Sequence, residues 1–371
     1  MPTAPLAPLS VVVLAAGAGA RMRSSRPKPL HRMCGLPMVR YVLDAVEELP
    51  TSRVVVVVGP DGERISKELR DAKPVTDVVE QASRRGTGDA VLAGLGPLVD
   101  HDLTVEGGEG DVLIVPADVP LLRGEVLAAL HAVHAASGAA ATVLAGVDMA
   151  RPDMGRVVRS DKDGTVARVV PSRDLVGREH TIEECATGIW CVRRSLLAPA
   201  LRRLEPDPET GEITLAGIAE VLAATGNRVE AHVDGRAREV VGVNDRRDLA
   251  AAERALRERI NSSWLGRGVT MVDPFQTYVD ATVSLAPDVT LFPGVILQGT
   301  TVVGEGTEIG PGCHLIDTRV GPGCRLEHVT AELATVGDDA RVGPYAVLAP
   351  GAEVAAATVT GAFYTAGADG P

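Results

Sequence analysis

The C-terminal third of the chain carries a six-residue repeat of aliphatic residues, and this repeat constrains the fold more than any other feature. Its phase slips after Leu315 and again after Leu326, and glycine-containing pairs such as Pro311-Gly312 separate the repeats. The aliphatic positions are Leu291, Leu297, Val303, Ile309, Leu315, Val320, Leu326, Val336, Val342, Leu348 and Val354. A six-residue period with glycine turns is typical of a parallel β-helix, whereas a β-sandwich alternates apolar and polar residues. Residues 267–371 are therefore predicted to form about four coils of a β-helix.

The first two thirds of the chain alternate between strand-like and helix-like segments. The clearest strands are predicted at Val54–Val58, Val112–Val115 and Thr142–Val147, and the clearest helices at Met38–Leu49, Gly88–Leu98 and Glu125–Ala136. This alternation indicates a mostly parallel sheet with helices on both faces. The charged, Ala-rich stretch from Asp248 to Leu265 is predicted to be a connecting helix. The predicted domains are therefore 1–246, the connecting segment 247–266, and 267–371.

Charge and cysteine content exclude several classes of protein. The 371 residues include 49 acidic and 37 basic side chains, a formal charge of -12, which argues against a nucleic-acid partner. No apolar run approaches a membrane span, so no membrane partner is expected. A secretory signal is not favoured either, because no Lys or Arg precedes Arg21 in the apolar N-terminal stretch. The five cysteines form no Cys-x-x-Cys pair, so we expect buried, reduced thiols and a cytoplasmic protein.

Two histidines lie three residues apart in an Ala-rich helical stretch. His131 and His134 could be metal ligands, but no third ligand clusters with them in the sequence. We therefore expect both to lie on the protein surface.

A glycine-rich turn near the N-terminus has the properties of a phosphate-binding loop. Val11–Leu14 is predicted to be a buried strand, and the small residues that follow let the backbone turn sharply. Arg21 and Lys28 then place two cations on the turn, so we expect a phosphate site here. A dinucleotide fingerprint would require glycine where Met22 stands, and the Gly-Lys-Ser/Thr of a Walker A loop is absent.

The same turn carries a family resemblance. Leu14-Ala-Ala-Gly-Ala-Gly-Ala-Arg-Met22, followed by Pro27-Lys28, resembles the signature of sugar-phosphate nucleotidyltransferases. Nearly the whole chain is similar to the bacterial N-acetylglucosamine-1-phosphate uridyltransferases, which form the first half of a bifunctional enzyme. The resemblance implies an α/β fold: a Rossmann-like nucleotidyltransferase domain followed by a left-handed parallel β-helix. It also implies a homotrimer.

The resemblance implies that a sugar 1-phosphate attacks the α-phosphorus of a nucleoside triphosphate and expels pyrophosphate. The implied substrates are UTP and, most simply, N-acetylglucosamine 1-phosphate. Such a site must position two mutually repelling anions and neutralise charge in the transition state. Arg21 and Lys28 are the predicted catalytic cations. The segment that precedes them is predicted to bind the nucleotide through Leu14, Ala15, Ala16 and Gly17.

Two residues far apart in the sequence are predicted to share a Mg²⁺ ion. Asp118 follows a buried strand, and Gly242-Val-Asn244-Asp-Arg246 is similar to the family's Gly-Val-Asn-x-Arg, whose asparagine binds magnesium. Few hard oxygen ligands, completed by phosphates and water, suit Mg²⁺. The alternatives are a helix N-cap role for Asp118 and a plain turn role for Asn244.

Base recognition is predicted at Gln81 and at Gly86-Thr87-Gly88, which resemble the family's uracil-reading residues. An amide side chain and exposed backbone groups can satisfy the hydrogen-bonding edge of a pyrimidine. Gly86 and Thr87 are therefore predicted, with Gln81, to bind the nucleotide. Arg84 and Arg85 are interpreted as additional, solvated cations.

The sugar side departs from the family pattern. Gly155 and Thr187 match the family's sugar-site positions, but Pro171 stands in place of an expected Glu and Ala186 in place of an Asn. Each lost hydrogen-bond partner costs about 1–3 kcal/mol when the opposing group is buried. The sequence therefore leaves open a different sugar 1-phosphate, or a non-catalytic trimeric homologue that binds nucleotide or regulates another protein.

The β-helix also departs from the family pattern. Ala349 stands where the family has an arginine before Pro-Gly-Ala, and the lysine-bearing segment that should follow is absent from this sequence. We therefore expect the acetyl-transfer half to be missing. The remaining coils are predicted to serve oligomerisation, and acetyltransferase activity is not expected.

Overall fold

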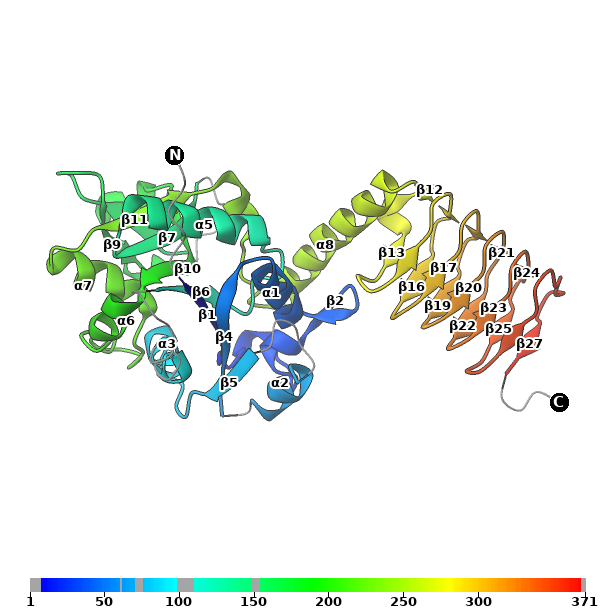
Figure 1. The fold of residues 1–371 in the computed structure, drawn as a ribbon, viewed down its shortest axis with the longest axis horizontal. Helices are drawn as coiled ribbons and strands as arrows, with labels where there is room; N and C mark the ends of the chain where they lie inside the picture. Colours follow the sequence, from blue (N-terminus) through cyan, green and yellow to red (C-terminus); the bar gives the residue numbers. More distant parts are fainter. Residues whose placement is uncertain (1–7, 61, 71–75, 99–109, 148–153, 368–371) are drawn as a thin grey trace. The chain divides into compact units, whose positions relative to one another are not determined.

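The computed structural model describes residues 8–60, 62–70, 76–98, 110–147 and 154–367 (Figure 1). The chain divides into two compact units. The first comprises Met1–His31 and Pro37–Asp248, and the second comprises Arg32–Leu36 and Leu249–Pro371. Among the described residues, no helix combines the length and the apolar character that crossing a membrane would require.

The first unit contains one mixed sheet with the strand order β11-β7-β10-β6-β1-β4-β5. The strands are β1 (Leu9–Ala15), β4 (Thr51–Val58), β5 (Thr76–Glu80), β6 (Asp111–Pro116), β7 (Ala141–Gly146), β8 (Arg156–Arg159), β9 (Val166–Val170), β10 (Cys185–Arg193) and β11 (Val229–Val233). Every neighbouring pair on this path is parallel except those of β10, which runs antiparallel to β6 and β7. The antiparallel ribbon β8–β9 extends from β10. The sheet is therefore mostly parallel, as predicted.

Helices cover both faces of this sheet (Figure 1). Side chains of α1 (Met38–Glu47), α2 (Glu63–Glu68) and α5 (Gly124–Ser137) pack on one face. Those of α3 (Thr87–Gly94), α6 (Arg194–Leu201) and α7 (Ile218–Ala224) pack on the other. Central strands such as β1 and β6 are almost wholly buried, because each is covered from both sides. Their runs of Val, Leu and Ile follow from that double burial.

The prediction that His131 and His134 lie on the surface is wrong. Only 3% of His131 and 2% of His134 are exposed, and both side chains lie in the interface between α5 and the sheet. The outer face of α5 instead carries small apolar residues such as Ala132 and Ala135. A carboxylate in the sheet, Asp111, lies 3.3 Å from a ring nitrogen of each imidazole, which compensates for burying them.

The second unit is a stack of short parallel strands in three sheets (Figure 1). The sheets are β12-β15-β18-β21-β24, β13-β16-β19-β22-β25-β27 and β14-β17-β20-β23-β26. The strands are β12 (Thr270–Met271), β13 (Tyr278–Val279), β14 (Ser284–Leu285), β15 (Thr290–Leu291), β16 (Ile296–Gln298), β17 (Val302–Val303), β18 (Glu308–Ile309), β19 (His314–Ile316), β20 (Arg319–Val320), β21 (Arg325–Leu326), β22 (Thr330–Glu332), β23 (Thr335–Val336), β24 (Arg341–Val342), β25 (Val347–Leu348), β26 (Glu353–Val354) and β27 (Thr365–Ala366). This arrangement is that of a left-handed parallel β-helix, as the resemblance implied. The repeating aliphatic residues form its core.

The structure explains how the coils stay in register where the sequence repeat slips. Ala331 is the inward residue between Leu326 and Val336, and it pairs with Leu315 of the preceding coil. Both sides of the prism around Ala331 are therefore five residues long. Left-handed corners at His328 (φ 49°) and Leu333 (φ 48°) close these two short sides.

A short hairpin far upstream belongs to the second unit. It consists of β2 (Arg32–Met33) and β3 (Leu36–Pro37), joined by a turn in which Cys34 and Gly35 have positive φ. The carbonyl of Cys34 accepts a hydrogen bond of 2.9 Å from the Ala281 amide in the first coil of the β-helix. A Cβ at Gly35 would lie 2.7 Å from the Asp280 carboxylate, so only glycine fits this turn. The long helix α8 (Arg246–Gly266) occupies the segment predicted to connect the domains.

Candidate active site

A cleft of about 770 Å³ opens beyond the carboxyl ends of β1 and β6. Ligands on open α/β sheets bind at this edge, and the volume is in the range of small-molecule sites. Its lining includes most of the predicted site residues, namely Leu14, Ala16, Gly17, Arg21, Gln81, Gly86, Thr87, Asp118 and Gly155. The cleft therefore brings together segments as distant in the sequence as Leu14 and Ala216.

The glycine turn shapes the base of the site. Gly19 has φ 62°, and a Cβ there would lie 2.7 Å from the Cβ of Lys28. Glycine is required at this position both for its backbone conformation and for the close approach of the lysine. Lys28 begins a single 3₁₀ turn (Lys28–Leu30) between Pro27 and Pro29. The two prolines fix the backbone φ angles on either side of Lys28, which limits where its ammonium can lie.

The ammonium of Lys28 lies between the two predicted metal ligands. Nζ contacts the Asp118 carboxylate and lies 3.1 Å from Oδ1 of Asn244. Carboxylate and amide oxygens from distant segments thus converge on one cation. This pair of hard oxygen donors is of the kind that fits a divalent cation such as Mg²⁺. Lys28 provides the positive charge that these two oxygens hold in the structure.

Asn244 is held in place by bonds to the two segments beside it. The Val243 amide donates to the Asp118 carbonyl at 2.8 Å. Arg246 donates to the Met22 carbonyl at 3.3 Å, and its guanidinium lies 3.3 Å from Nδ1 of His31. The asparagine segment is therefore fixed against both the strand end that carries Asp118 and the glycine turn.

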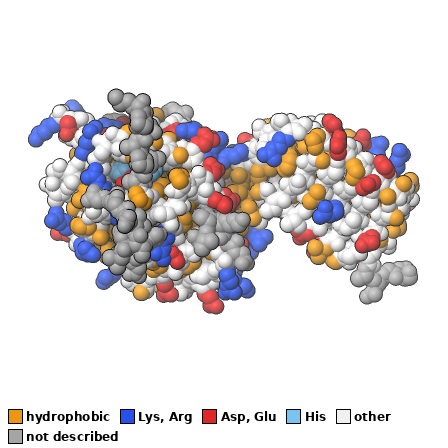
Figure 2. All heavy atoms as spheres, viewed as in Figure 1, with side chains coloured by type: hydrophobic (Ala, Val, Ile, Leu, Met, Phe, Trp, Pro, Cys, Tyr) orange, Lys and Arg blue, Asp and Glu red, His pale blue; other side chains and the backbone are white. Residues whose placement is uncertain are grey.

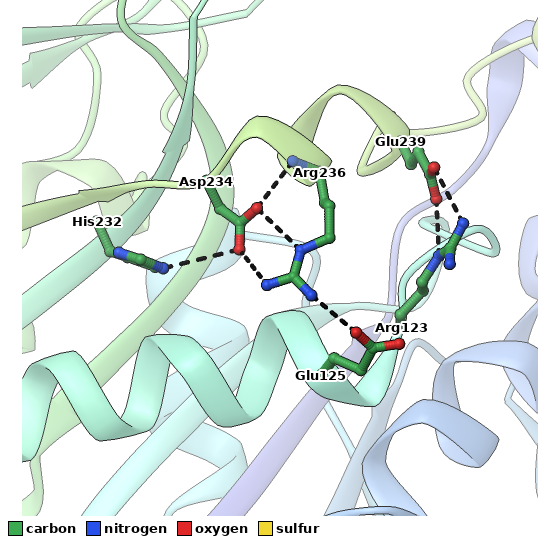
Figure 3. A network of polar contacts seen from close by, with 6 residues as sticks. All are labelled: Arg123, Glu125, His232, Asp234, Arg236 and Glu239. Atoms are coloured by element: carbon green, nitrogen blue, oxygen red, sulfur yellow. Dashed lines mark hydrogen bonds and ion pairs between the residues drawn. The ribbon is translucent and has the colours of Figure 1, made fainter.

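A second set of bonds steadies the segment that precedes Asn244 (Figure 3). Arg123, five residues after Asp118, binds both carboxylate oxygens of Glu239 at 2.9 and 3.1 Å. The Arg236 guanidinium bridges Asp234 and Glu125, the latter at the start of α5. The Arg236 hydrogen bonds are the main cause that lowers the pKa of Asp234. This network links the loop after Asp118 to the loop before Asn244.

On the base side, the amide of Gln81 is partly engaged within the protein. Its Nε2 donates to the Gly86 carbonyl at 3.1 Å and to Asp89 at 2.8 Å. The amide oxygen is therefore the atom with which Gln81 can accept a hydrogen bond from a base. The contact with Gly86 also fixes the loop that forms this wall of the cleft.

The Gly86-Thr87 segment is tied to a strand-like stretch from the far side of the cleft. The Thr87 hydroxyl accepts a 2.9 Å bond from the Leu215 amide, and the Gly88 amide donates to the Ile213 carbonyl at 2.8 Å. Gly86 has φ 103°, and a Cβ there would lie 2.5 Å from the Ile213 carbonyl oxygen. A side chain at position 86 would therefore push these two walls apart.

The arginines at the cleft differ in their partners. Arg21 is exposed, lines the cleft, and forms no hydrogen bond or ion pair with the described residues. Its guanidinium is therefore available to a phosphate. Arg84 also lines the cleft, but its Nε donates to the Ala16 carbonyl at 3.0 Å. Arg84 is therefore anchored to the glycine turn, which its interpretation as a solvated cation did not anticipate.

Two predicted substrate-binding residues point elsewhere. The Thr187 hydroxyl donates to the Leu144 carbonyl at 2.9 Å and is not part of the cleft lining. Ala15 is buried in β1 beneath the cleft. The substituted residues Pro171 and Ala186 do line the cleft, near Gly155. The departures from the family pattern therefore lie where a substrate would contact them.

The structure adds cleft residues that the sequence did not identify. Trp190 is buried and lines the cleft beneath the sugar side, while Arg173 contributes a further cation that pairs with Asp207. Arg246 is the last residue of the Gly-Val-Asn-x-Arg motif, but the sequence alone assigned no role to its side chain. No comparable sequence signal marks Trp190, because one aromatic residue in a strand is typical of any core.

Comparisons with known proteins agree with this geometry. Residues 11–266 match the family described as the MobA-like NTP transferase domain. The bifunctional protein GlmU of Streptomyces avermitilis is 41% identical over 96% of this chain and 73% of its own length. GlmU of Streptomyces coelicolor is 40% identical over 97% of this chain and 73% of its own length. GlmU of Caldanaerobacter subterraneus is 34% identical over 91% of this chain and 71% of its own length.

These matches identify the protein's class as the nucleotidyltransferases, enzymes that transfer a nucleotidyl group from a nucleoside triphosphate. More narrowly, the chain belongs to the GlmU family.

Proposed function

We propose that the protein catalyses Mg²⁺-dependent uridylyl transfer from UTP to a sugar 1-phosphate, most simply N-acetylglucosamine 1-phosphate. The observation that carries the proposal is the convergence of Asp118 and Asn244 on a cation at a cleft that Arg21 also lines. In this reaction a phosphate oxygen of the sugar attacks the α-phosphorus of UTP. The bond to the β-phosphate breaks, and pyrophosphate leaves with the electron pair.

The protein's own residues act on charge and position. The attacking phosphate is already largely ionised near neutral pH, because its second pKa is about 6. Arg21 and Lys28 therefore act by holding the phosphates together and stabilising negative charge in the transition state. Asp118 and Asn244 would hold the Mg²⁺, which would supply further positive charge to stabilise the phosphates in the transition state.

Selection of the base is assigned to the loop that carries Gln81, Gly86 and Thr87. The Oε1 atom of Gln81 can accept from the N3–H of uracil, whereas N3 of cytosine is an acceptor. This difference supports UTP over CTP. Replacing Gln81 by Ala should reduce that preference more than it reduces the maximal rate.

Pro171 and Ala186 favour a second candidate, transfer to a different sugar 1-phosphate. Neither side chain can hydrogen-bond a sugar hydroxyl, and both line the cleft. These substitutions would weaken the binding of a sugar 1-phosphate without the acetamido group less than they weaken the binding of N-acetylglucosamine 1-phosphate. Gly155 and the rest of the cleft are compatible with either sugar.

We also propose that the β-helix assembles the protein as a homotrimer. Large apolar side chains are exposed along this unit, including Tyr345, Val347, Val359 and Phe363. Figure 2 shows hydrophobic side chains between charged ones on the visible face of the β-helix. The exposed rings of Tyr345 and Phe363 stack on each other, with their centroids 5.4 Å apart, and exposed apolar surface of this kind favours association with another protein surface.

The test is a screen for pyrophosphate release with each of the four ribonucleoside triphosphates and several hexose 1-phosphates at saturating Mg²⁺. We expect the highest kcat/KM with UTP, and the sugar ranking separates the two candidates. Arg21→Gln should lower kcat about 100-fold. Arg23→Gln is the matched control, because Arg23 is exposed on the same turn but does not line the cleft. Absence of turnover with every pair would refute the proposal.

A further inference from the structure

A second group of ligand-type side chains is buried at the opposite end of β6 from the cleft. Asp111 begins the strand, and its two carboxylate oxygens lie 3.3 Å from Nε2 of His131 and 3.3 Å from Nε2 of His134. Cys191 completes the group. One oxygen of Asp111, a ring nitrogen of His134 and the Cys191 sulfur all lie within 4.8 Å of one another.

Strand register explains why these residues meet. Cys191 on β10 pairs with Leu113 on β6 and with Thr142 on β7. Asp111, two residues before Leu113, therefore shares a face of the sheet with Cys191 and Thr142. Helix α5 covers this face, and His131 and His134 extend from it toward the sheet. Three elements of the first unit, β6, α5 and β10, thus supply the group.

The buried donor atoms of the group favour a cation. Each carboxylate oxygen of Asp111 lies 3.3 Å from a ring nitrogen of one of the two imidazoles. The thiol of Cys191 is wholly buried and forms no hydrogen bond with the described residues. A buried carboxylate, an imidazole nitrogen and an unpartnered sulfur are thus directed at one point.

We propose that Asp111, His134 and Cys191 bind a zinc-class divalent ion. Tetrahedral zinc has bonds of about 2.0 Å to nitrogen or oxygen and 2.3 Å to sulfur, which puts neighbouring ligand atoms roughly 3.2–3.8 Å apart. The 3.3 Å between His134 and Asp111 already meets this spacing. The sulfur needs a shift of no more than about 1.5 Å, which side-chain rotation supplies.

Neighbouring groups would hold the ligands in the required orientation. Nδ1 of His134 lies 2.8 Å from the Thr142 hydroxyl, so a proton on Nδ1 leaves the Nε2 lone pair for the metal. His131 donates to the second oxygen of Asp111 and thereby orients the carboxylate. Metal binding releases the Cys191 thiol proton to solvent, and His134 binds in its neutral form.

The donor set separates this site from the cleft. Nitrogen and sulfur ligands select zinc, cobalt or nickel, whereas the oxygens of Asp118 and Asn244 suit Mg²⁺. The proposed ion would fasten α5 to β10, the strand that also supplies Ala186 and Trp190 to the cleft. Its role is structural, since none of its ligands lines the cleft.

The first experiment uses the intact chain without an affinity tag, kept reduced and in millimolar Mg²⁺. Zinc is measured by plasma mass spectrometry, and Co²⁺ is then added to metal-free protein. We expect one zinc per chain and a near-ultraviolet sulfur-to-cobalt charge-transfer band. Failure of the wild-type chain to bind either ion in titrations up to tenfold excess would overturn the proposal, independently of any activity.

The second experiment compares two cysteines on one strand. Cys191→Ser should abolish the charge-transfer band and weaken zinc binding at least tenfold, whereas Cys185→Ser should change neither, although Cys185 is also buried on β10. Asp118→Asn removes the oxygen site and should leave zinc binding intact. An unchanged far-ultraviolet circular dichroism spectrum and a cooperative thermal transition show that each variant is folded. A band that survives in Cys191→Ser, or is lost in Cys185→Ser, contradicts the assignment.

Discussion

Strand β6 has an aspartate near each end, and the two carboxylates have opposite surroundings. Asp118 is 25% exposed, lines the cleft, and contacts the ammonium of Lys28, which also donates to Oδ1 of Asn244. Asp111 is 9% exposed and lies beneath α5 against two imidazoles and near a thiol. The comparison teaches that the partners from other elements, and not the residue type, decide what a carboxylate can bind.

The two carboxylates also differ in the property of the protein that their replacement should change. At the carboxyl end, the Asp118 carboxylate is partly open to solvent and is therefore accessible to a ligand that enters the cleft. At the amino end, burial makes exchange slow and makes the carboxylate part of the core. We therefore expect replacement of Asp118 to impair activity and replacement of Asp111 to impair stability.

The largest effect should come from Asp118→Asn. The amide keeps the shape of the side chain but lacks the charge that binds the cation, so the transfer rate should fall about 100-fold or more at fixed Mg²⁺. The melting temperature should change little, because the carboxylate is partly solvated. Pyrophosphate release and differential scanning calorimetry measure the two quantities. A large loss of stability in Asp118→Asn would contradict the proposed contrast between Asp118 and Asp111.

Asp111→Asn should do the reverse. Removing the charge leaves His131 and His134 buried without their carboxylate, a change that costs about 3 kcal/mol in buried pairs. The melting temperature should fall by roughly 6–12 °C for a domain of this size. At a temperature where the variant is folded, kcat with saturating substrates should remain within about threefold of wild type. A hundredfold loss of kcat in fully folded protein would contradict the separation of the two ends.

A smaller effect is expected from the network that joins the loops of the two cleft ligands. Arg123→Gln removes the paired bonds to Glu239, and an exposed ion pair contributes up to about 1 kcal/mol. The Mg²⁺ concentration for half-maximal rate should therefore rise about threefold to fivefold, with a small change in kcat. Arg159→Gln breaks a similar paired contact with Glu184 away from the cleft and is the matched control. Equal effects of both variants would show that Arg123 does not position the site.

The smallest effect concerns the acid dependence of stability. Arg236 holds the pKa of Asp234 below its ordinary value of 3.8, so the folded state binds that proton less readily than the unfolded chain. The ion pair therefore stabilises the fold above about pH 4, and this contribution is lost as the pH falls through the folded pKa. Asp234→Asn should lower stability slightly at pH 7, and the difference from wild type should disappear as the pH falls through the folded pKa of Asp234. Urea titrations at several pH values would reveal it, and a difference that grows on acidification would refute it.

Much of the fold could be predicted because its determinants are local. The inward residues of the β-helix recur along the chain, since each side of a prism buries one aliphatic residue. The glycine turn could be recognised because Gly19 has to satisfy both a backbone angle and the approach of Lys28. The path of the backbone at Ala331 could not be predicted, because two successive five-residue sides of the prism interrupt the six-residue repeat there.

The candidate site was only partly predictable. Lys28, Asp118 and Asn244 belong to separate motifs, and each motif carried its own signal. Thr187 also matched a motif, yet its hydroxyl bonds the Leu144 carbonyl of the neighbouring strand. Which way a strand residue points depends on its pairing partners, and the motif alone does not contain them.

By itself, the sequence determined the class of each domain, the phosphate-binding turn and the residue types at the cation site, since these follow from periodicity, backbone freedom and local chemistry. The tertiary structure decided which distant side chains share a partner. It placed the Asp118 carboxylate against the ammonium of Lys28, and it buried His131 and His134 against Asp111. The physical reason is that burial and electrostatic pairing are properties of neighbours in space, and strand order brings those neighbours together.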